Sequence, residues 1–151
     1  MMAFLPLYFE IGVIVAIFFA LLEIQIEGKH GWAKKLPTWR KQFWLFNRIF
    51  GRKKELTGYH VSMWLFIFSM LHTAFIFAPW TLQNEALVFS LYIFITLSED
   101  FLWFVLNPAF GLKKFSRKYV TWHPKWLGPL PFQYYLGIMA WVALFWFGIN
   151  Y

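Results

Sequence analysis

The chain has no cysteine among its 151 residues. This excludes disulfide bonds, iron–sulfur clusters and thiol-based catalysis. Charged residues are also scarce, at 14% of the chain, whereas soluble domains carry roughly 25%. Aspartate occurs once, at Asp100, which argues against transferases that hold two metals with aspartate-rich motifs. Glycine-rich phosphate loops and the His-Glu-x-x-His zinc motif are absent as well.

Apolar residues dominate what remains, since 60% of the chain is hydrophobic and 25% is aromatic, with ten Trp. Four segments are long and apolar enough to span a bilayer, at about residues 4–26, 59–78, 85–106 and 130–150. Lipid-exposed backbone must form its hydrogen bonds within its own segment, so all four should be helices. The sequence therefore predicts an all-α integral membrane protein, a single four-transmembrane-helix bundle over residues 1–151.

The fourteen Lys and Arg residues are confined to two loops, at residues 28–56 and 108–128. Lys and Arg concentrate in the loops that stay in the cytoplasm. We therefore expect both loops on the cytoplasmic face of a plasma (inner) membrane, with both termini outside. The net charge of +7 then favours membrane lipids with anionic headgroups as partners, and nucleic acid is not expected.

The first basic loop carries an aromatic stripe at helical spacing, which predicts an amphipathic helix capped by Thr38. The stripe consists of Trp39, Phe43, Phe46 and Phe50. Such a helix either lies in the membrane interface or packs on the cytoplasmic end of the bundle. The second loop also has aromatic residues among its lysines, at less regular spacing, and we expect it to form another interfacial segment. If the first loop lies in the interface, basic side chains can bind an anionic substrate headgroup, and the candidates are Arg40, Arg48 and Arg52.

Six acids and histidines fall at or near the cytoplasmic ends of the four spans. They are Glu23, Glu27, His60, Glu99, Asp100 and His123. Ionisable residues inside the hydrocarbon mark functional sites by default, and adjacent carboxylates need a cation or a shared proton. We predict that these six can hold a divalent metal, with Zn, Fe, Mn and Mg left open. Glu99, Asp100 and Glu23 are the candidate catalytic residues.

A structural role for these residues is the alternative. Glu99 or Asp100 could pair with basic loop residues, and His60 could cap the second span. Only one Glu-x-x-His spacing occurs, at Glu27 and His30, where the first span is expected to end, so the motif itself is weak. Haem is not expected, because His72 has no histidine partner at its depth. His72 could instead hydrogen-bond with Glu10 near the outer face.

Three functions remain open. The first is a small membrane enzyme that acts on an amphiphilic substrate, such as a lipid, isoprenoid or acyl chain, at the cytoplasmic interface. The second is a non-catalytic membrane subunit or lipid-binding scaffold whose buried acids form structural ion pairs. The third, a transporter, would need several copies to enclose a pathway. A homo-oligomer or a larger membrane complex is compatible with any of them.

Overall fold

A computed structural model describes residues 4–44, 47–48, 55–123 and 125–150. Its long helices are α1 (Phe4–Glu27), α3 (Gly58–His72), α4 (Leu82–Leu106) and α5 (Phe132–Asn150). A short 3-10 turn, η1 (Thr73–Ile76), continues α3. Among the described residues, four helical segments are long and apolar enough to cross a membrane, and their ends differ from the predicted spans by at most three residues. The prediction of an all-helical chain with four helices of this length and composition is confirmed.

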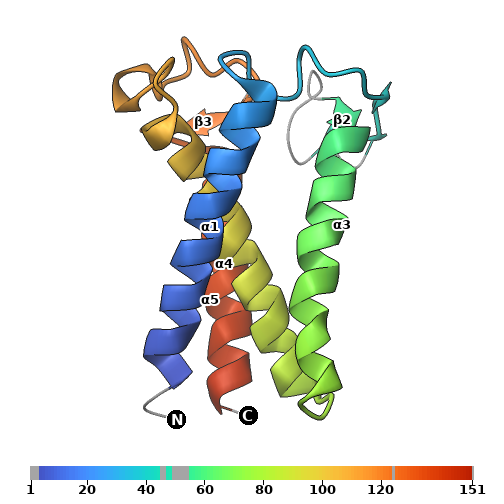
Figure 1. The fold of residues 1–151 in the computed structure, drawn as a ribbon. Helices are drawn as coiled ribbons and strands as arrows, with labels where there is room; N and C mark the ends of the chain where they lie inside the picture. The colour runs from blue at the N-terminus through green and yellow to red at the C-terminus, as the bar shows by residue number, and fades with distance from the viewer. Residues whose placement is uncertain (1–3, 45–46, 49–54, 124, 151) are drawn as a thin grey trace.

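Helix α4 is the centre of the bundle, because both α1 and α5 pack along it (Figure 1). Near the chain termini, Tyr8 of α1 donates or accepts a 2.8 Å hydrogen bond with Ser90 of α4, and its ring lies 5.0 Å from that of Phe145 of α5. Helix α3 contacts α4 mainly at this end, where the rings of Phe68 and Phe89 are 5.3 Å apart. Toward the loops α3 diverges from the other helices (Figure 1). This divergence leaves room for a cavity at the loop end of the bundle.

Both basic loops lie at the end of the bundle opposite the two termini (Figure 1). Each contains two antiparallel strands of two residues, and the second strand of each pair leads directly into a long helix. In the first loop β1 (Arg40–Lys41) pairs with β2 (Leu56–Thr57), and α3 follows. In the second, the 3-10 turn η2 (Leu112–Lys114) is followed by β3 (Trp126–Leu127), which pairs with β4 (Leu130–Pro131) before α5. The two basic loops therefore lie at the same end of the bundle, as predicted.

The predicted amphipathic helix does not begin at Thr38. Arg40 and Lys41 are extended in β1, and Thr38 Oγ1 accepts a 2.9 Å hydrogen bond from the backbone N–H of Tyr59. Thr38 thus caps the start of α3 because the β1–β2 pairing places it there. Trp44, Asn47 and Arg48 are helical, whereas Phe46 and Phe50 lie outside the described residues. In the second loop, helical structure among the described residues is limited to η2.

Helices α3 and α4 start with the same capping interaction. Thr57 Oγ1 accepts a hydrogen bond from the backbone N–H of His60 at 3.2 Å, and Thr81 Oγ1 accepts one from Asn84 at 3.1 Å. A threonine in extended conformation before the first turn satisfies an amide that the helix itself leaves unpaired. The two caps differ in their location, since Thr57 lies at the loop end of the bundle and Thr81 lies at the opposite end.

Candidate metal centre

A cavity of about 530 Å³ lies among α1, α3, α4, α5 and the two loops. The rest of its lining comes from the adjoining turns of α3, α4 and α5 and is mostly apolar. The residues there are Met63, Trp64, Tyr92, Ile93, Thr96, Leu97, Leu136 and Gly137. The part nearest the loops is lined by acids, histidines and aromatic residues. Thus one continuous space joins a polar end to an apolar end.

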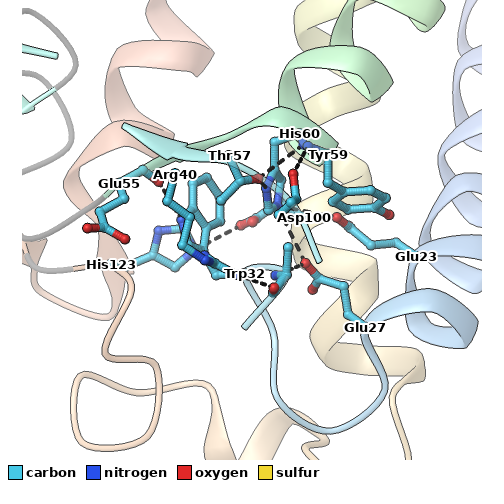
Figure 2. Close-up of polar contacts among 12 residues, drawn as sticks. Glu23, Glu27, Trp32, Arg40, Glu55, Thr57, Tyr59, His60, Asp100 and His123 are labelled. Carbon is cyan, nitrogen blue, oxygen red and sulfur yellow. Dashed lines mark hydrogen bonds and ion pairs between the residues drawn. The ribbon is translucent and has the colours of Figure 1, made fainter. Parts of the chain in front are cut away.

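The structure brings all six predicted metal residues to this cavity. Glu23 and Glu27 come from α1, His60 from α3, Glu99 and Asp100 from α4, and His123 from the loop before α5. All but Asp100 are more than nine-tenths buried. Figure 2 shows Asp100 between His123 on one side and Glu23 and Glu27 on the other. Four segments that are distant in sequence therefore contribute polar side chains at one depth.

The three predicted headgroup arginines are placed differently. Arg40 donates a hydrogen bond from Nη2 to the backbone oxygen of Ala33, which orders the first loop. The Arg48 side chain is exposed, and its backbone oxygen accepts a 3.1 Å hydrogen bond from Lys125 Nζ. Neither arginine lines the cavity, and Arg52 lies outside the described residues. Arg40 and Arg48 are therefore not positioned to hold a headgroup inside it.

Glu23, Glu27 and His60 form the tightest group. Glu23 and Glu27 are one helical turn apart on the same face of α1. His60 Nε2 lies 3.6 Å from Glu23 Oε1 and 3.5 Å from Glu27 Oε1, and one ligand atom from each residue lies within 4.8 Å of the others. These distances exceed those of good hydrogen bonds. Two ligand atoms bound tetrahedrally to one ion at about 2.0–2.1 Å are about 3.4 Å apart, so the spacing fits a shared metal.

The His60 ring is held in place from two sides. Its Nδ1 lies 2.6 Å from Thr57 Oγ1, and its ring stacks on Trp32 with centroids 3.9 Å apart. Trp32 is fixed in turn, since its Nε1 donates a 2.8 Å hydrogen bond to the backbone oxygen of Glu55. When Nδ1 donates to the threonine, Nε2 presents its lone pair to the carboxylates. A histidine oriented in this way through its second nitrogen is typical of metal ligands.

The loop after α1 positions the Glu27 carboxylate. Gly28 and Gly31 have φ values of 62° and 60°, and Trp32 and Ala33 are also left-handed, at 50° each. Backbone with positive φ favours glycine, and the resulting tight loop turns the chain back toward α1. The backbone N–H of Ala33 consequently donates a hydrogen bond to Glu27 Oε1. The two glycines are the sequence signal that could have predicted this turn.

A second polar group lies across the cavity. Asp100 Oδ2 lies 3.3 Å from His123 Nε2 and accepts a hydrogen bond from the Tyr134 hydroxyl. The side-chain amide of Gln133 contacts His123 Nδ1. Neither Gln133 nor Tyr134 was among the residues predicted from sequence. The signal for them was their position at the start of α5, at the same depth as the six predicted residues.

Glu99 precedes Asp100 on α4. Its side chain is 95% buried and shares a hydrogen bond with Glu23. Its Oε1 atom has no hydrogen-bond partner among the described residues, and the same holds for Nε1 of Trp103 one turn further along α4. Both residues line the cavity. These two atoms are thus free to accept and to donate a hydrogen bond to a molecule in the cavity.

Aromatic side chains cover the polar end. Phe104 stacks on Trp122 with ring centroids 5.9 Å apart, and Trp103 and Phe110 contact both of them. Phe104 and Trp103 are almost completely buried. Trp103, Phe104 and Trp122 thus form an aromatic wall beside the acids and histidines.

The predicted contact between Glu10 and His72 is wrong. His72 Nε2 lies 3.1 Å from Glu85 Oε1 of α4, and Trp80 Nε1 donates a 2.9 Å hydrogen bond to the same carboxylate. Glu10 is exposed on α1. The pairing follows from the short connection between α3 and α4, which places the end of one helix beside the start of the next. This His72–Glu85 pair lies outside the cavity, so variants of His72 can serve as controls for variants of the cavity histidines.

Replacing Thr57 with Val is expected to weaken divalent-metal binding by roughly 10- to 100-fold, the usual effect of removing the group that orients a ligating histidine. The loss of the helix cap alone should cost about 1 kcal/mol. Thr81→Val removes the equivalent cap from α4 and should leave metal affinity unchanged. Competition titration with a chromogenic chelator measures both variants. Equal metal affinities in the two variants would contradict the orienting role of Thr57.

No family model, curated protein or solved structure matches this chain.

Proposed function

We propose that this protein is an integral membrane enzyme that binds a divalent metal at Glu23, Glu27 and His60 and acts on an amphiphilic lipid, isoprenoid or acyl substrate. The observation that carries the proposal is the cavity itself. It joins a group with metal-ligand spacing to an apolar space between helices that are long and apolar enough to cross a membrane. The reactive end of a substrate would lie against the acids while its tail lies among the helices.

The apolar part of the cavity supports a hydrocarbon tail as its occupant. It is lined by Met63 and Trp64 of α3, Ile93 and Leu97 of α4, and Leu136 of α5. Its total volume lies within the range of about 300–1,000 Å³ that is usual for small-molecule sites. Burial of each CH₂ group contributes roughly 0.8 kcal/mol relative to water. This gain applies to a tail that comes from water. A tail that comes from the bilayer is already out of water, so its binding would depend on how well it packs in the cavity.

The polar end supplies the groups for acid–base and Lewis-acid chemistry. A metal held by Glu23, Glu27 and His60 would polarise a substrate oxygen. Asp100, hydrogen-bonded by Tyr134, is placed to accept or return a proton, and Glu99 offers an unpaired oxygen nearby. The unpaired Trp103 Nε1 can donate to a substrate oxygen. Glu99, Asp100 and Glu23 thus keep the catalytic roles expected from sequence, with Glu23 acting through the metal.

We propose that the basic loops face the cytoplasm and that both termini lie outside a plasma (inner) membrane. The asymmetric distribution of Lys and Arg supports this orientation. Exposed Trp39, Phe43 and Trp44 in the first loop suit the membrane interface, and Lys41 lies 5.9 Å from the Trp39 ring centroid. The exposed Arg48 would then contact anionic lipid headgroups of the bilayer rather than the substrate.

One observation favours the alternative of a non-catalytic subunit. If His60 is protonated, its position between Glu23 and Glu27 makes a buried ion-pair triad, which needs no metal. Such a triad would fasten α3 to α1 at the end where α3 otherwise stands apart. Metal analysis distinguishes the two functions, because the triad requires a proton on the nitrogen that the metal would occupy.

Met63→Trp is expected to fill the apolar part of the cavity and to displace lipid that co-purifies with the protein. Met63 lines the cavity, whereas Met70, on the same helix, is half exposed on its outer surface. Met70→Trp is therefore the matched control and should keep the lipid. Mass spectrometry of lipid extracted from each purified variant measures the effect. Equal lipid content in wild type and Met63→Trp would argue against the cavity as the tail site.

A further inference from the structure

We infer that the head of the substrate is uncharged and carries a hydroxyl group, which makes long-chain alcohols the substrate class of this cavity. The inference rests on the proposed function, which leaves the head group open. It follows from two unpaired polar atoms in the cavity lining and from the balance of charge around them.

The two unpaired atoms are Glu99 Oε1 and Trp103 Nε1, neither of which has a hydrogen-bond partner among the described residues. Both side chains line the cavity, and Glu99 and Trp103 are only 5% and 3% exposed. The two residues are one turn apart on α4 and therefore lie on the same face of the helix. A molecule in the cavity can thus accept a hydrogen bond from the indole and donate one to the carboxyl oxygen.

A hydroxyl group meets both requirements with a single oxygen atom, because it donates through its hydrogen and accepts through its lone pairs. An ammonium group has no lone pair for the indole of Trp103. An ether or an ionised carboxylate has no hydrogen for Glu99 Oε1. Each of these heads would leave one buried polar atom unpaired, which weakens binding by about 10-fold or more.

Aromatic neighbours hold the Trp103 indole in place. Its ring centroid lies 5.1 Å from that of Phe104, 5.0 Å from that of Phe110 and 5.9 Å from that of Trp122. These rings leave the indole little freedom to turn toward another partner, so Nε1 is ordered before a ligand binds. A donor that is already ordered loses little entropy on binding.

The charge around these atoms disfavours a charged head, since lysine and arginine are absent from the lining formed by the described residues. Glu23 and Glu99 share a hydrogen bond, and a hydrogen bond between two carboxyl groups requires a proton on one of them. Together with Glu27 they therefore carry two negative charges, which the divalent ion of the proposed metal site offsets. Asp100 has its own partner in His123, whose Nε2 lies 3.3 Å from Asp100 Oδ2. A charged head would enter without a counter-charge, which is strongly unfavourable in a buried site.

The experiment measures the binding of matched amphiphiles to the full-length, metal-loaded protein in detergent, with native mass spectrometry as the readout. The probes are dodecanol, its isomer undecyl methyl ether, dodecanoic acid, dodecyl phosphate and dodecylamine. Affinities are expressed relative to the mole fraction of each probe in the micelle, which corrects for partitioning. Dodecanol should bind at least about 10-fold more tightly than each of the others, because each of them leaves an atom unpaired or a charge unbalanced.

Trp103→Phe removes the indole N–H and retains an aromatic ring, so dodecanol affinity should fall by about 5-fold, the usual contribution of one hydrogen bond. The affinity of dodecylamine, which cannot accept from the indole, should stay within about twofold. Trp141→Phe is the matched control, because Trp141 Nε1 donates a 3.2 Å hydrogen bond to the Tyr8 hydroxyl and lies outside the cavity. Its dodecanol affinity should equal that of wild type. Comparison of dodecanol with its ether isomer in wild type remains as the test if Trp103→Phe fails to fold.

Equal affinities for dodecanol and its ether isomer would overturn the inference, as would tighter binding of the acid, the phosphate or the amine. Either result leaves the proposed function intact, provided that the bound probe is displaced in Met63→Trp, which is expected to fill the apolar part of the cavity. If no probe binds, or if binding is unchanged in Met63→Trp, the cavity is not the substrate site and both proposals are wrong.

Discussion

His60→Gln is expected to lower the divalent-metal affinity of the protein by at least about 100-fold, more than the loss of an orienting group usually costs. Glutamine keeps much of the ring's volume and its stacking surface against Trp32, but it removes the Nε2 atom that faces both carboxylates. Glu27→Gln should have a similar effect, because it removes one of the two anionic ligands. Isothermal or chelator-competition titration of the purified protein with Mn²⁺ or Zn²⁺ measures the change.

His72→Gln is the matched control for this variant. His72 lies on the same helix, 12 residues further along, and also faces a carboxylate, that of Glu85 at 3.1 Å. It lies outside the cavity, so its replacement should leave metal affinity within about twofold of wild type. Similar affinities in His60→Gln and wild type would show that the metal, if bound, is held elsewhere.

Removal of the metal should destabilise the wild-type protein by about 4 kcal/mol under conditions where the metal was present at 1,000 times its dissociation constant. The physical reason is that Glu23 and Glu27 lie side by side in a buried site, where two carboxylates cannot both remain ionised without a cation. For a chain of this size the loss corresponds to a fall of roughly 10 °C in the unfolding midpoint. The ten tryptophans allow the transition to be followed by intrinsic fluorescence with and without chelator.

The same measurement on His60→Gln separates a site effect from a general effect of the chelator. The variant should start with a lower midpoint than metal-loaded wild type and should change little when chelator is added. An equal shift in both proteins, or none in wild type, would contradict stabilisation by a metal at this site.

The helices and the depth of the polar residues were predictable from the sequence. Long apolar segments have one stable structure in a bilayer, which is why the predicted spans agree closely with the four helices. Since successive spans run in opposite directions, residues near matching span ends share a level. Glu23, His60, Glu99 and His123 therefore meet in one cavity although up to 100 residues separate them.

The pairing of individual side chains was not predictable in the same way. Depth along a helix does not fix its rotation, so nothing in the sequence distinguished Glu85 from Glu10 as the partner of His72. The hairpin that holds Arg40 in a strand depends on pairing with Leu56 and Thr57 across the loop, and this tertiary contact overrides the helical spacing of the aromatic stripe. Gln133 and Tyr134 were missed because neutral polar residues at a span end are common, so their position at the start of α5 did not by itself mark them as site residues.

The most direct test of the metal site is anomalous X-ray scattering from crystals of the full-length protein loaded with Mn²⁺ or Zn²⁺, collected at the absorption edge of the ion. The predicted result is an anomalous peak about 2.0–2.2 Å from Glu23, Glu27 and His60 Nε2, which disappears in His60→Gln crystals. Crystals that contain the ion and show no peak among those three residues would contradict it.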